Sequence, residues 1–404
     1  MALFEYVAKN NVDGSKVKST VQADSDRAAA KLLIAQGLTP LNVRSIDEGS
    51  GWIERYSNRI RSKDKVIFFR QFATLLNAGL PLVQSLRIVK DQSESKRLQA
   101  IAQEVIGDVE GGKTLSSAFE KHPNLSSNVI VALVAAGEVS GTLDTSLERI
   151  ANQLEKDSEV MGKVRSAMVY PIIVVVVIIA VIAFMMIAVM PQIQQLYVDL
   201  KQQLPFITLV MVGFSTFIRY FWWLILILMG LAVYFSKQYI ATKSGREHWD
   251  SIKYNMPLFG KLFKKLYMAR FTRTGEVLLS SGVHMIEMLK ICADAVNNVK
   301  VGQSIKNASE KVHSGKALSV ALKDESYILP LVPQMIGIGE QSGSIDSMME
   351  KSASYYEKEL DNEIRALSTA IEPVLMVLLA IVAGFLVVAI LLPIYGLVGS
   401  GAIN

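Results

Sequence analysis

The sequence has few of the residues from which disulfide frameworks and many active sites are built. It contains one cysteine, Cys292, and four histidines in 404 residues. One cysteine excludes a disulfide framework and a cysteine-rich zinc module. The four histidines show no ligand spacing, and no nucleophile can be paired with a base. We therefore predict no catalytic residue, no cofactor and no metal site.

Charge is also scarce, and it is unevenly distributed. Charged residues make up 20% of the chain and hydrophobic residues 51%, whereas soluble domains average about 25% charged residues. Residues 172–190 and 374–392 contain no charge at all, and each stretch is long enough to span a bilayer as a helix. A third apolar region, residues 206–235, is interrupted only by Arg219. The first fifty residues show no secretory signal, so we expect no signal-peptide cleavage.

The positions of the charges predict the orientation of three membrane spans. Segments 1–170 and 236–370 hold 75 of the 79 charged residues. Basic residues flank the first two spans on the side of these segments: Lys163, Arg165, Lys237, Lys243 and Arg246. The positive-inside rule then places the N-terminus and both large segments in the cytoplasm and the C-terminus outside.

Arg219 has two interpretations. It could be a functional charge in the middle of a long span. Alternatively, residues 219–223 (Arg-Tyr-Phe-Trp-Trp) form an interfacial belt, because aromatic side chains and snorkelling arginines favour the headgroup level. We prefer the belt, with residues 206–218 along the outer surface.

The sequence contains an internal duplication. Three segments of the first copy match the second at shifts of 202 or 203 residues: 68–79 with 271–282, 112–116 with 315–319, and 137–144 with 339–346. Pro171 and Pro191 match Pro373 and Pro393. Each copy therefore predicts a helical bundle leading into a membrane span, and the unduplicated middle span returns the chain.

Two details support the helical prediction for the bundles. Val66, Phe69, Ala73 and Leu76 have the spacing of one apolar helix face. Gly79 and its counterpart Gly282 stand where a left-handed residue would end that helix.

We thus predict a mainly α polytopic membrane protein with two duplicated cytoplasmic helical bundles, three transmembrane helices and a small N-terminal α+β domain. In that domain, strands are expected over 4–9, 16–22 and 41–46, and a helix from Ser25 to Gln36. The predicted boundaries of the first half are 1–46 for the α+β domain, 47–62 for a linker, 63–170 for the first bundle and 171–190 for the first transmembrane helix. An external loop and interfacial segment is expected over 191–219, the second transmembrane helix over 220–236 and a cytoplasmic connector over 237–265. The second bundle is expected over 266–370, the third transmembrane helix over 371–397 and an external tail over 398–404.

Residues Gly107 to Thr114 fit the phosphate-binding pattern G-x-x-x-x-G-K-T. A real P-loop follows a buried strand, whereas the residues before Gly107 have helical spacing. Asp108 and Glu110 would also place negative charge inside the phosphate cradle. The second copy keeps only Gly315-Lys316 of the pattern. We therefore interpret the match as coincidence and retain a membrane-anchored ATPase only as the alternative function.

The duplicated element Gly-Glu-x-Ser-Gly-x-(Leu/Ile)-Asp is more specific to this chain. Its candidate residues are Glu138, Ser140, Gly141 and Asp144 in the first copy, and Glu340, Ser342, Gly343 and Asp346 in the second. We favour a structural corner between two helices, with each aspartate in the first turn of the next helix. The alternative is a carboxylate cluster that holds a hard cation or a basic partner surface, although such cations usually need more oxygen ligands.

Two further pairs of candidate residues stand at the mouths of the first and third spans: Tyr170-Pro171 and Glu372-Pro373. Glu372 fits either an interfacial glutamate at a helix N-terminus or a polar contact with another transmembrane helix. Cys292 aligns with a core position of the first copy, so we expect a small buried side chain rather than a reactive thiol.

Together these motifs resemble the inner-membrane platform proteins of type IV pilus and type II secretion machines, the PilC/GspF family. The resemblance covers nearly the whole chain. It is carried by the two Gly-Glu-x-Ser-Gly elements before Tyr170-Pro171 and Glu372-Pro373, by Leu204-Pro205, Ser215 and Trp222-Trp223, and by Tyr6-Val7-Ala8, Asp13-Gly14, Ala23-Asp24-Ser25 and Gly37-Leu38-Thr39-Pro40.

The resemblance implies a non-enzymatic platform in the bacterial inner (cytoplasmic) membrane. Its implied partners are a cytoplasmic hexameric assembly ATPase, pilin or pseudopilin subunits, other inner-membrane assembly components, membrane lipid and further copies of itself in a homo-oligomer, with no direct contact to nucleic acid. A small-molecule transporter is disfavoured, because three spans and one boundary carboxylate offer little polar pathway.

Overall fold

The computed structural model describes residues 2–10, 16–23, 26–35, 38–45, 60–199, 206–257 and 259–399. Its first unit is a three-stranded antiparallel sheet of order β2-β1-β3 (β1, Ala2–Asn10; β2, Lys16–Ala23; β3, Leu38–Ser45). Helix α1 (Asp26–Ala35) connects β2 to β3, and its Leu33 is buried with Ala8 of β1. This confirms the predicted α+β unit. Ser25, Gln36 and most of the linker predicted over 47–62 lie outside the described residues.

The first bundle is formed by five helices and the first part of a sixth. These are α3 (Ser62–Asn77), α4 (Leu82–Gln92), α5 (Lys96–Glu110), α6 (Leu115–Glu120), α7 (Asn128–Ser140) and α8 (Leu143–Phe184). On α3, the predicted face is buried at Phe69 and Ala73, and Phe68 and Phe72 are buried beside them. The ring of Phe69 lies 5.8 Å from that of Phe119 on α6, so aromatic packing joins the two helices.

The second bundle repeats this plan after a connecting helix, α11 (Lys243–Asn255). It contains α12 (Gly260–Ser280), α13 (Met285–Ala295), α14 (Val299–His313), α15 (Leu318–Lys323), α16 (Leu331–Ser342) and the first part of α17 (Ile345–Gly399). The described glycines with positive φ fall into three matched pairs between the copies: Gly79 with Gly282, Gly112 with Gly315, and Gly141 with Gly343. The duplication thus extends to the backbone conformation of the turns.

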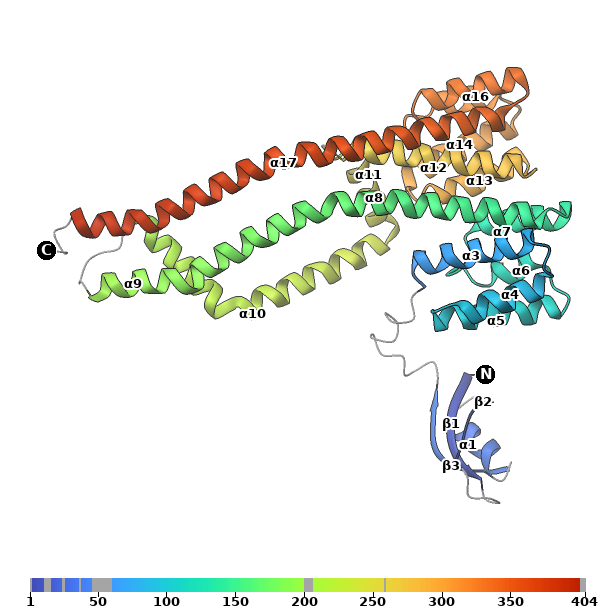
Figure 1. The fold of residues 1–404 in the computed structure, drawn as a ribbon, viewed down its shortest axis with the longest axis horizontal. Helices are drawn as coiled ribbons and strands as arrows, with labels where there is room; N and C mark the ends of the chain where they lie inside the picture. Colours follow the sequence, from blue (N-terminus) through green and yellow to red (C-terminus); the bar gives the residue numbers. More distant parts are fainter. Residues whose placement is uncertain are drawn as a thin grey trace.

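The two bundles lie side by side and share one interior. Helix α8 of the first copy packs against α17 of the second, and α7 contacts α12 and α13. The buried side chains of both bundles accordingly form one continuous hydrophobic cluster, which runs from Phe68 in the first copy to Leu367 in the second. Figure 1 shows the two bundles at one end of the molecule and the long helices leaving them in the same direction.

Both long helices continue from their bundle into the apolar part of the chain. Helix α17 is unbroken from Ile345 to Gly399. Helix α8 passes through Pro171 to Phe184, where a π-helical turn, η1 (Met185–Val189), leads into α9 (Met190–Asp199). A proline has no N–H to donate to the preceding turn, and the wider turn before Pro191 accommodates that loss. Residues 191–199, predicted as the start of an external loop, are therefore helical.

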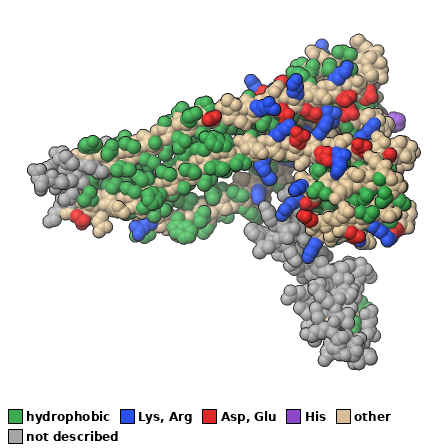
Figure 2. All heavy atoms as spheres, viewed as in Figure 1, with side chains coloured by type: hydrophobic (Ala, Val, Ile, Leu, Met, Phe, Trp, Pro, Cys, Tyr) green, Lys and Arg blue, Asp and Glu red, His purple; other side chains and the backbone are tan. Residues whose placement is uncertain are grey.

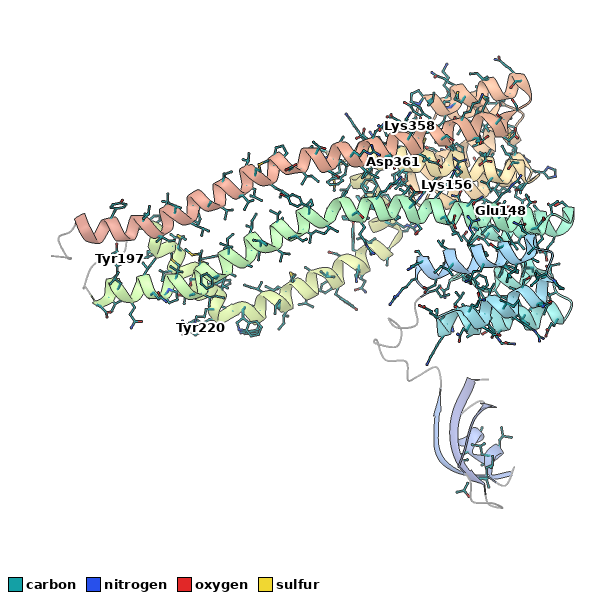
Figure 3. All side chains as sticks on the ribbon, in the orientation of Figure 1. Glu148, Lys156, Tyr197, Tyr220, Lys358 and Asp361 are labelled. Atoms are coloured by element: carbon teal, nitrogen blue, oxygen red, sulfur yellow. The ribbon has the colours of Figure 1, made fainter. Side chains whose placement is uncertain are left out.

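The middle apolar helix is bent. Helix α10 (Phe206–Ala241) leaves helical geometry at Phe221, where φ is −112° and ψ is 16°. In Figure 3 Tyr220 lies at this bend. The part before it packs on η1 and α9, where Met211 and Val212 are buried with Met186 and Met190. The break falls beside Arg219, within the predicted aromatic belt, and the membrane depth of Arg219 stays a prediction.

Within the part of the chain that the structure describes, three helical stretches could cross a membrane by length and composition: Leu143–Asp199, Leu209–Ala241 and Ile345–Val388. Their most apolar windows are almost entirely unburied within the protein. Figure 2 shows the corresponding surface as hydrophobic along the shaft, with charged side chains concentrated over the bundles. The chain is thus a multi-pass membrane protein with an apolar shaft and a charged head.

Candidate functional site at the junction of the two bundles

The glutamates of the duplicated element cap short helices. Oε2 of Glu138 accepts hydrogen bonds from the backbone N–H and the hydroxyl of Ser116, at 3.1 and 2.5 Å, and Oε1 accepts one from the N–H of Leu115. Glu340 does the same at the start of α15, where the N–H of Leu318 lies 2.6 Å from its Oε1 and Ser319 also donates. Each carboxylate satisfies backbone donors that the first turn of a helix leaves free.

The serine and glycine of the element form the turn into the long helix. Gly141 and Gly343 adopt left-handed φ values of +74° and +70°. Ser140 Oγ donates to the carbonyl of Ala136 at 2.8 Å, and Ser342 Oγ donates to that of Ile338 at 2.9 Å. These contacts are internal to each corner.

The aspartates of the element stand apart from the glutamates. Asp144 and Asp346 are exposed in the first turns of α8 and α17, while Glu138 and Glu340 are turned toward α6 and α15. Among the described residues, no group of three or more histidine, cysteine, aspartate or glutamate side chains could hold a metal ion. The aspartates remain available to a partner surface, and that role stays a prediction.

The residues at the mouths of the spans lie on continuous helix. Pro171 is inside α8 and Pro373 inside α17. Tyr170 and Glu372 are exposed on the same helices. The structure brings neither of them to a candidate residue on another helix, and the polar contact between Glu372 and another transmembrane helix stays a prediction.

The phosphate-binding pattern lies on a helix end rather than on a strand and loop. Gly107 and Asp108 belong to α5. The backbone N–H groups of Gly111, Gly112 and Lys113 donate to carbonyls within the same turn, so they are not free for phosphate. The Lys113 ammonium lies 2.6 Å from Asp108 Oδ1, and its hydrogen bond, with that of Lys121, lowers the pKa of Asp108 to about 2.

The structure reveals a duplicated ion pair that the sequence analysis missed. Arg70 on α3 binds Glu155 on α8, with its Nε 2.6 Å from Oε1. At the equivalent positions of the second copy, Arg273 on α12 binds Glu357 on α17 through two hydrogen bonds of 2.8 and 2.9 Å. The signal was present in the sequence, because shifts of 203 and 202 residues map both members of the first pair onto the second. Bidentate arginine–carboxylate pairs fix geometry as well as adding stability.

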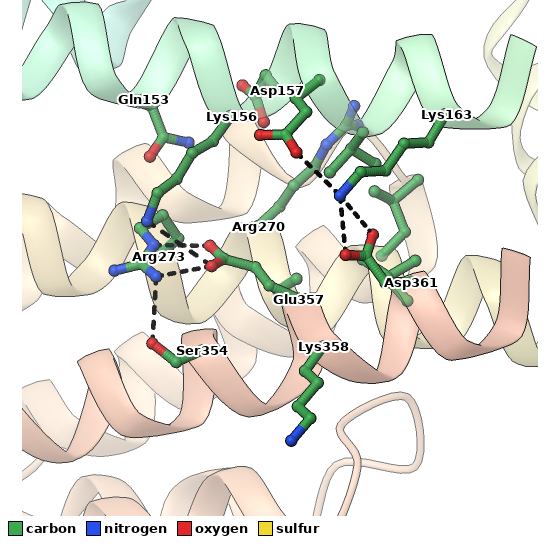
Figure 4. A pocket seen from close by; sticks show the side chains of 15 residues that line it. Gln153, Lys156, Asp157, Lys163, Arg270, Arg273, Ser354, Glu357, Lys358 and Asp361 are labelled. Atoms are coloured by element: carbon green, nitrogen blue, oxygen red, sulfur yellow. Dashed lines mark hydrogen bonds and ion pairs between the residues drawn. The ribbon is translucent and has the colours of Figure 1, made fainter. Parts of the chain in front are cut away.

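The second of these pairs lies in a pocket where the two bundles meet (Figure 4). The pocket has a volume of about 340 Å³ and is lined by α8, α12 and α17. Its charged lining residues are Lys156, Asp157, Glu159, Lys163, Arg270, Arg273, Glu357, Lys358 and Asp361. Figure 3 places Lys156 and Asp361 on the two long helices.

Ion pairs cross this junction from one copy to the other. Lys163 Nζ on α8 lies 2.8 Å from both carboxylate oxygens of Asp361 on α17, and Lys156 Nζ lies 3.7 Å from Glu357 Oε2. Nearer the turns of the bundles, Arg149 Nη1 donates to Ser281 Oγ at 2.6 Å. The junction therefore ties the helix that enters the membrane from the first copy to the one that enters it from the second.

Asp157 is an unfavourably placed charge in the junction. Burial raises the pKa of its carboxyl, and the positive charge of Arg270 with a hydrogen bond from Gln153 offsets only part of that rise. Ionised Asp157 therefore costs stability.

The junction can hold and orient helices, and its groups do not form a nucleophile–base arrangement. The cysteine is elsewhere: Cys292 is fully buried in the second bundle, as predicted, and burial raises the pKa of its thiol. A high thiol pKa makes Cys292 a poor nucleophile.

Comparison with known proteins matches both copies and the N-terminal unit to one protein family. The family model described as type II secretion system (T2SS), protein F, matches residues 68–191 and 271–393, and its N-terminal domain matches residues 1–44. The first two matches begin on α3 and α12 and end beyond α8 and within α17, which are the two copies of the duplication.

Curated relatives cover nearly the full length. The chain is 37% identical to the type IV pilus assembly protein PilC of Thermus thermophilus, over 99% of both chains, and 36% identical to PilC of Myxococcus xanthus, over 99% of this chain and 96% of the relative. It is 31% identical to type II secretion system protein F of Vibrio cholerae, over 98% of both chains. With two family domains in the duplicated bundles and relatives of this identity along its length, the chain belongs to the PilC/GspF family of type IV pilus and type II secretion proteins.

Proposed function

We propose that this chain is a non-enzymatic inner-membrane platform of a type IV pilus or type II secretion machine. In this role it couples a cytoplasmic hexameric ATPase to the insertion or extraction of pilin or pseudopilin subunits. The names of the relatives support the role, and the higher identities among the relatives above belong to pilus assembly proteins.

One structural observation carries the mechanical part of the proposal. The last helix of each bundle continues without interruption toward the membrane, over Leu143–Phe184 and Ile345–Gly399, and the two are tied together at the junction. A displacement imposed on either bundle is therefore transmitted along packed helices rather than absorbed in a loop. The motor supplies the energy, and this chain supplies the connection to apolar pilin helices.

The mechanical connection is tested by reversing charges across the junction. Lys163→Glu and Asp361→Lys each place like charges together, and the double variant restores opposite charges. We expect each single variant to reduce the number of surface pili, or the amount of secreted substrate, and the double variant to recover it. Membrane abundance of the protein, measured by immunoblot, separates lost assembly from lost protein.

A matched control reverses one charge of an ion pair inside the first bundle. Arg87 and Glu110 are exposed and join α4 to α5 within the first copy. Arg87→Glu should leave assembly unchanged, because exposed pairs contribute little. Normal assembly in both junction variants at normal abundance would contradict the proposed connection.

The partners are tested on the full-length protein. We expect an assembly ATPase from the same machine to co-purify with it from membranes, and photo-crosslinks from exposed positions on α17, such as Val377, to capture a pilin. If both partners are folded and present and neither is recovered, the partner assignment fails.

A further inference from the structure

A second pocket lies where the connector reaches the base of the second bundle. It has a volume of about 430 Å³ and is formed by the end of α11, the start of α12 and the face of α17 before its apolar part. Its polar and charged lining residues are Tyr254, Asn255, Lys261, Lys264 and Glu363, and its apolar ones include Met256, Pro257 and Leu367. Gly260 allows this tight corner, because a Cβ there would lie 2.8 Å from the carbonyl oxygen of Tyr254.

The pocket lies next to the predicted membrane-spanning part of α17. Its last lining residue on α17 is Ala370, and the uncharged stretch begins at residue 374. Four residues of helix correspond to about 6 Å, and the headgroup layer is about 5–8 Å thick on each side of the hydrocarbon. A ligand in this pocket would therefore meet the membrane surface rather than bulk solvent or the acyl interior.

The pocket carries an unbalanced positive charge. Its carboxylate, Glu363, is already bound by Lys265 at 2.7 Å, and Lys265 also binds Glu359 at 2.8 Å. Lys261 and Lys264 have no carboxylate within ion-pair distance among the described residues. Lys264 Nζ instead lies 4.5 Å from the ring centroid of Tyr254, and this cation–π contact fixes the ammonium at the pocket wall.

We propose that this pocket binds the phosphate headgroup of an anionic phospholipid. Lys261 and Lys264 supply the two ammonium groups that contact the phosphate oxygens, and Met256, Pro257 and Leu367 flank the start of the acyl chains. Two cations beside an apolar wall at the membrane surface suit a phosphate attached to a lipid better than a free anion, which has no use for the apolar side. Such a lipid would fix the base of the second bundle at the bilayer surface.

The test compares lipid selectivity in full-length protein reconstituted into phosphatidylcholine vesicles that contain spin-labelled phosphatidylglycerol as a minor component. The fraction of immobilised label reports association with the protein. For Lys261→Gln/Lys264→Gln we expect the association constant of the strongest site to fall by about tenfold or more, since each lysine near the surface contributes several-fold. Lys261→Arg/Lys264→Arg keeps both charges and should retain the site.

The matched control is Lys316→Gln/Lys351→Gln, which removes the same charge from exposed positions far from the apolar part of α17. It should leave the association constant unchanged. Equal losses in both glutamine pairs would reduce the effect to net charge and overturn the proposal. Competition by inorganic phosphate at low concentration would assign the pocket to a free anion instead. Thermal unfolding in pure phosphatidylcholine shows whether each variant is folded, and an unfolded glutamine pair is replaced by single substitutions.

Discussion

Glu138 and Glu340 show how one residue type serves the same structural purpose twice. Each is half-buried and accepts hydrogen bonds from the first turn of the short helix beside it. Removing such a carboxylate leaves backbone donors without partners, whereas removing an exposed aspartate of the same element removes only a favourable charge near a helix N-terminus.

We therefore expect Glu138→Ala to lower the free energy of unfolding by about 1–3 kcal/mol, and Asp144→Ala by no more than about 1 kcal/mol. Thermal unfolding of the detergent-solubilised protein measures both. If Asp144→Ala abolishes assembly while leaving stability intact, the aspartates form a partner surface. If Asp144→Ala proves the more destabilising of the two, the structural interpretation of the corner is wrong.

The burial of the Asp157 carboxyl leads us to expect an unusual dependence of stability on pH. Its carboxyl pKa is raised by burial, so the folded state binds this proton more tightly than the unfolded state does. The stability that this proton contributes is complete below the ordinary pKa of about 3.9 and is lost as the pH rises through the folded-state value.

Asp157→Asn removes the charge that burial disfavours. We expect its melting temperature to equal or exceed that of the parent protein at neutral pH, and the difference to vanish as the pH falls toward about 4. Asp91→Asn, at an exposed site on α4, is the control and should show no such trend. A melting temperature lowered at neutral pH would mean that the contact with Arg270 outweighs the cost of burial.

At the scale of helices and turns, Gly137 and Gly107 both lie within helices but differ in the space around them. Only Gly137 has neighbouring atoms that leave no room for a Cβ. A Cβ on Gly137 would lie 2.5 Å from Ser146 Oγ and 3.1 Å from Leu143 Cα, whereas one on Gly107 meets nothing within 4 Å. Gly137 therefore allows α7 to approach α8 closely, and Gly107 has no such role.

Gly137→Ala should consequently lower the free energy of unfolding by about 1–3 kcal/mol or more, as expected for overpacking. Gly107→Ala should stabilise it by up to about 1 kcal/mol, because alanine is the better helix former. Thermal unfolding of the two variants side by side checks this. An equal effect of both substitutions would show that the close approach of α7 and α8 has no importance for stability.

The helices show what the sequence could predict and what it could not. Local patterns were sufficient for α3, for the left-handed Gly79 and Gly282 and for the two glycine–serine corners, because spacing and turn chemistry are local properties. They were insufficient at Pro191, where a π-helical turn keeps the chain helical. Whether a proline ends a helix depends on how the preceding turn adjusts, and that adjustment is not visible in residue types.

At the scale of the whole molecule, the duplication predicted the architecture but not the junction. A duplication in the sequence indicates that the protein contains two similar bundles. It does not tell how Lys163 of one copy comes to face Asp361 of the other, because these positions are not equivalent between the copies. Contacts between copies depend on their relative placement, which no periodicity encodes.

The orientation in the membrane stays a prediction that cysteine labelling can test. Because Cys292 is fully buried, an introduced cysteine is the main reactive thiol. We expect Asp199→Cys, at the end of α9, to react with a membrane-impermeant maleimide on intact cells, and Lys316→Cys to react only after the inner membrane is permeabilised. Labelling with the opposite pattern would invert the proposed orientation.

The continuous interior shared by the two bundles has a thermodynamic consequence. Domains with separate cores can melt one after the other, but a common core makes the loss of one copy expose buried surface of the other. Calorimetry should therefore record a single cooperative transition for both copies. Gene duplication has in this sense produced one folding unit, so that a substitution in the interior of either copy changes the stability of both copies.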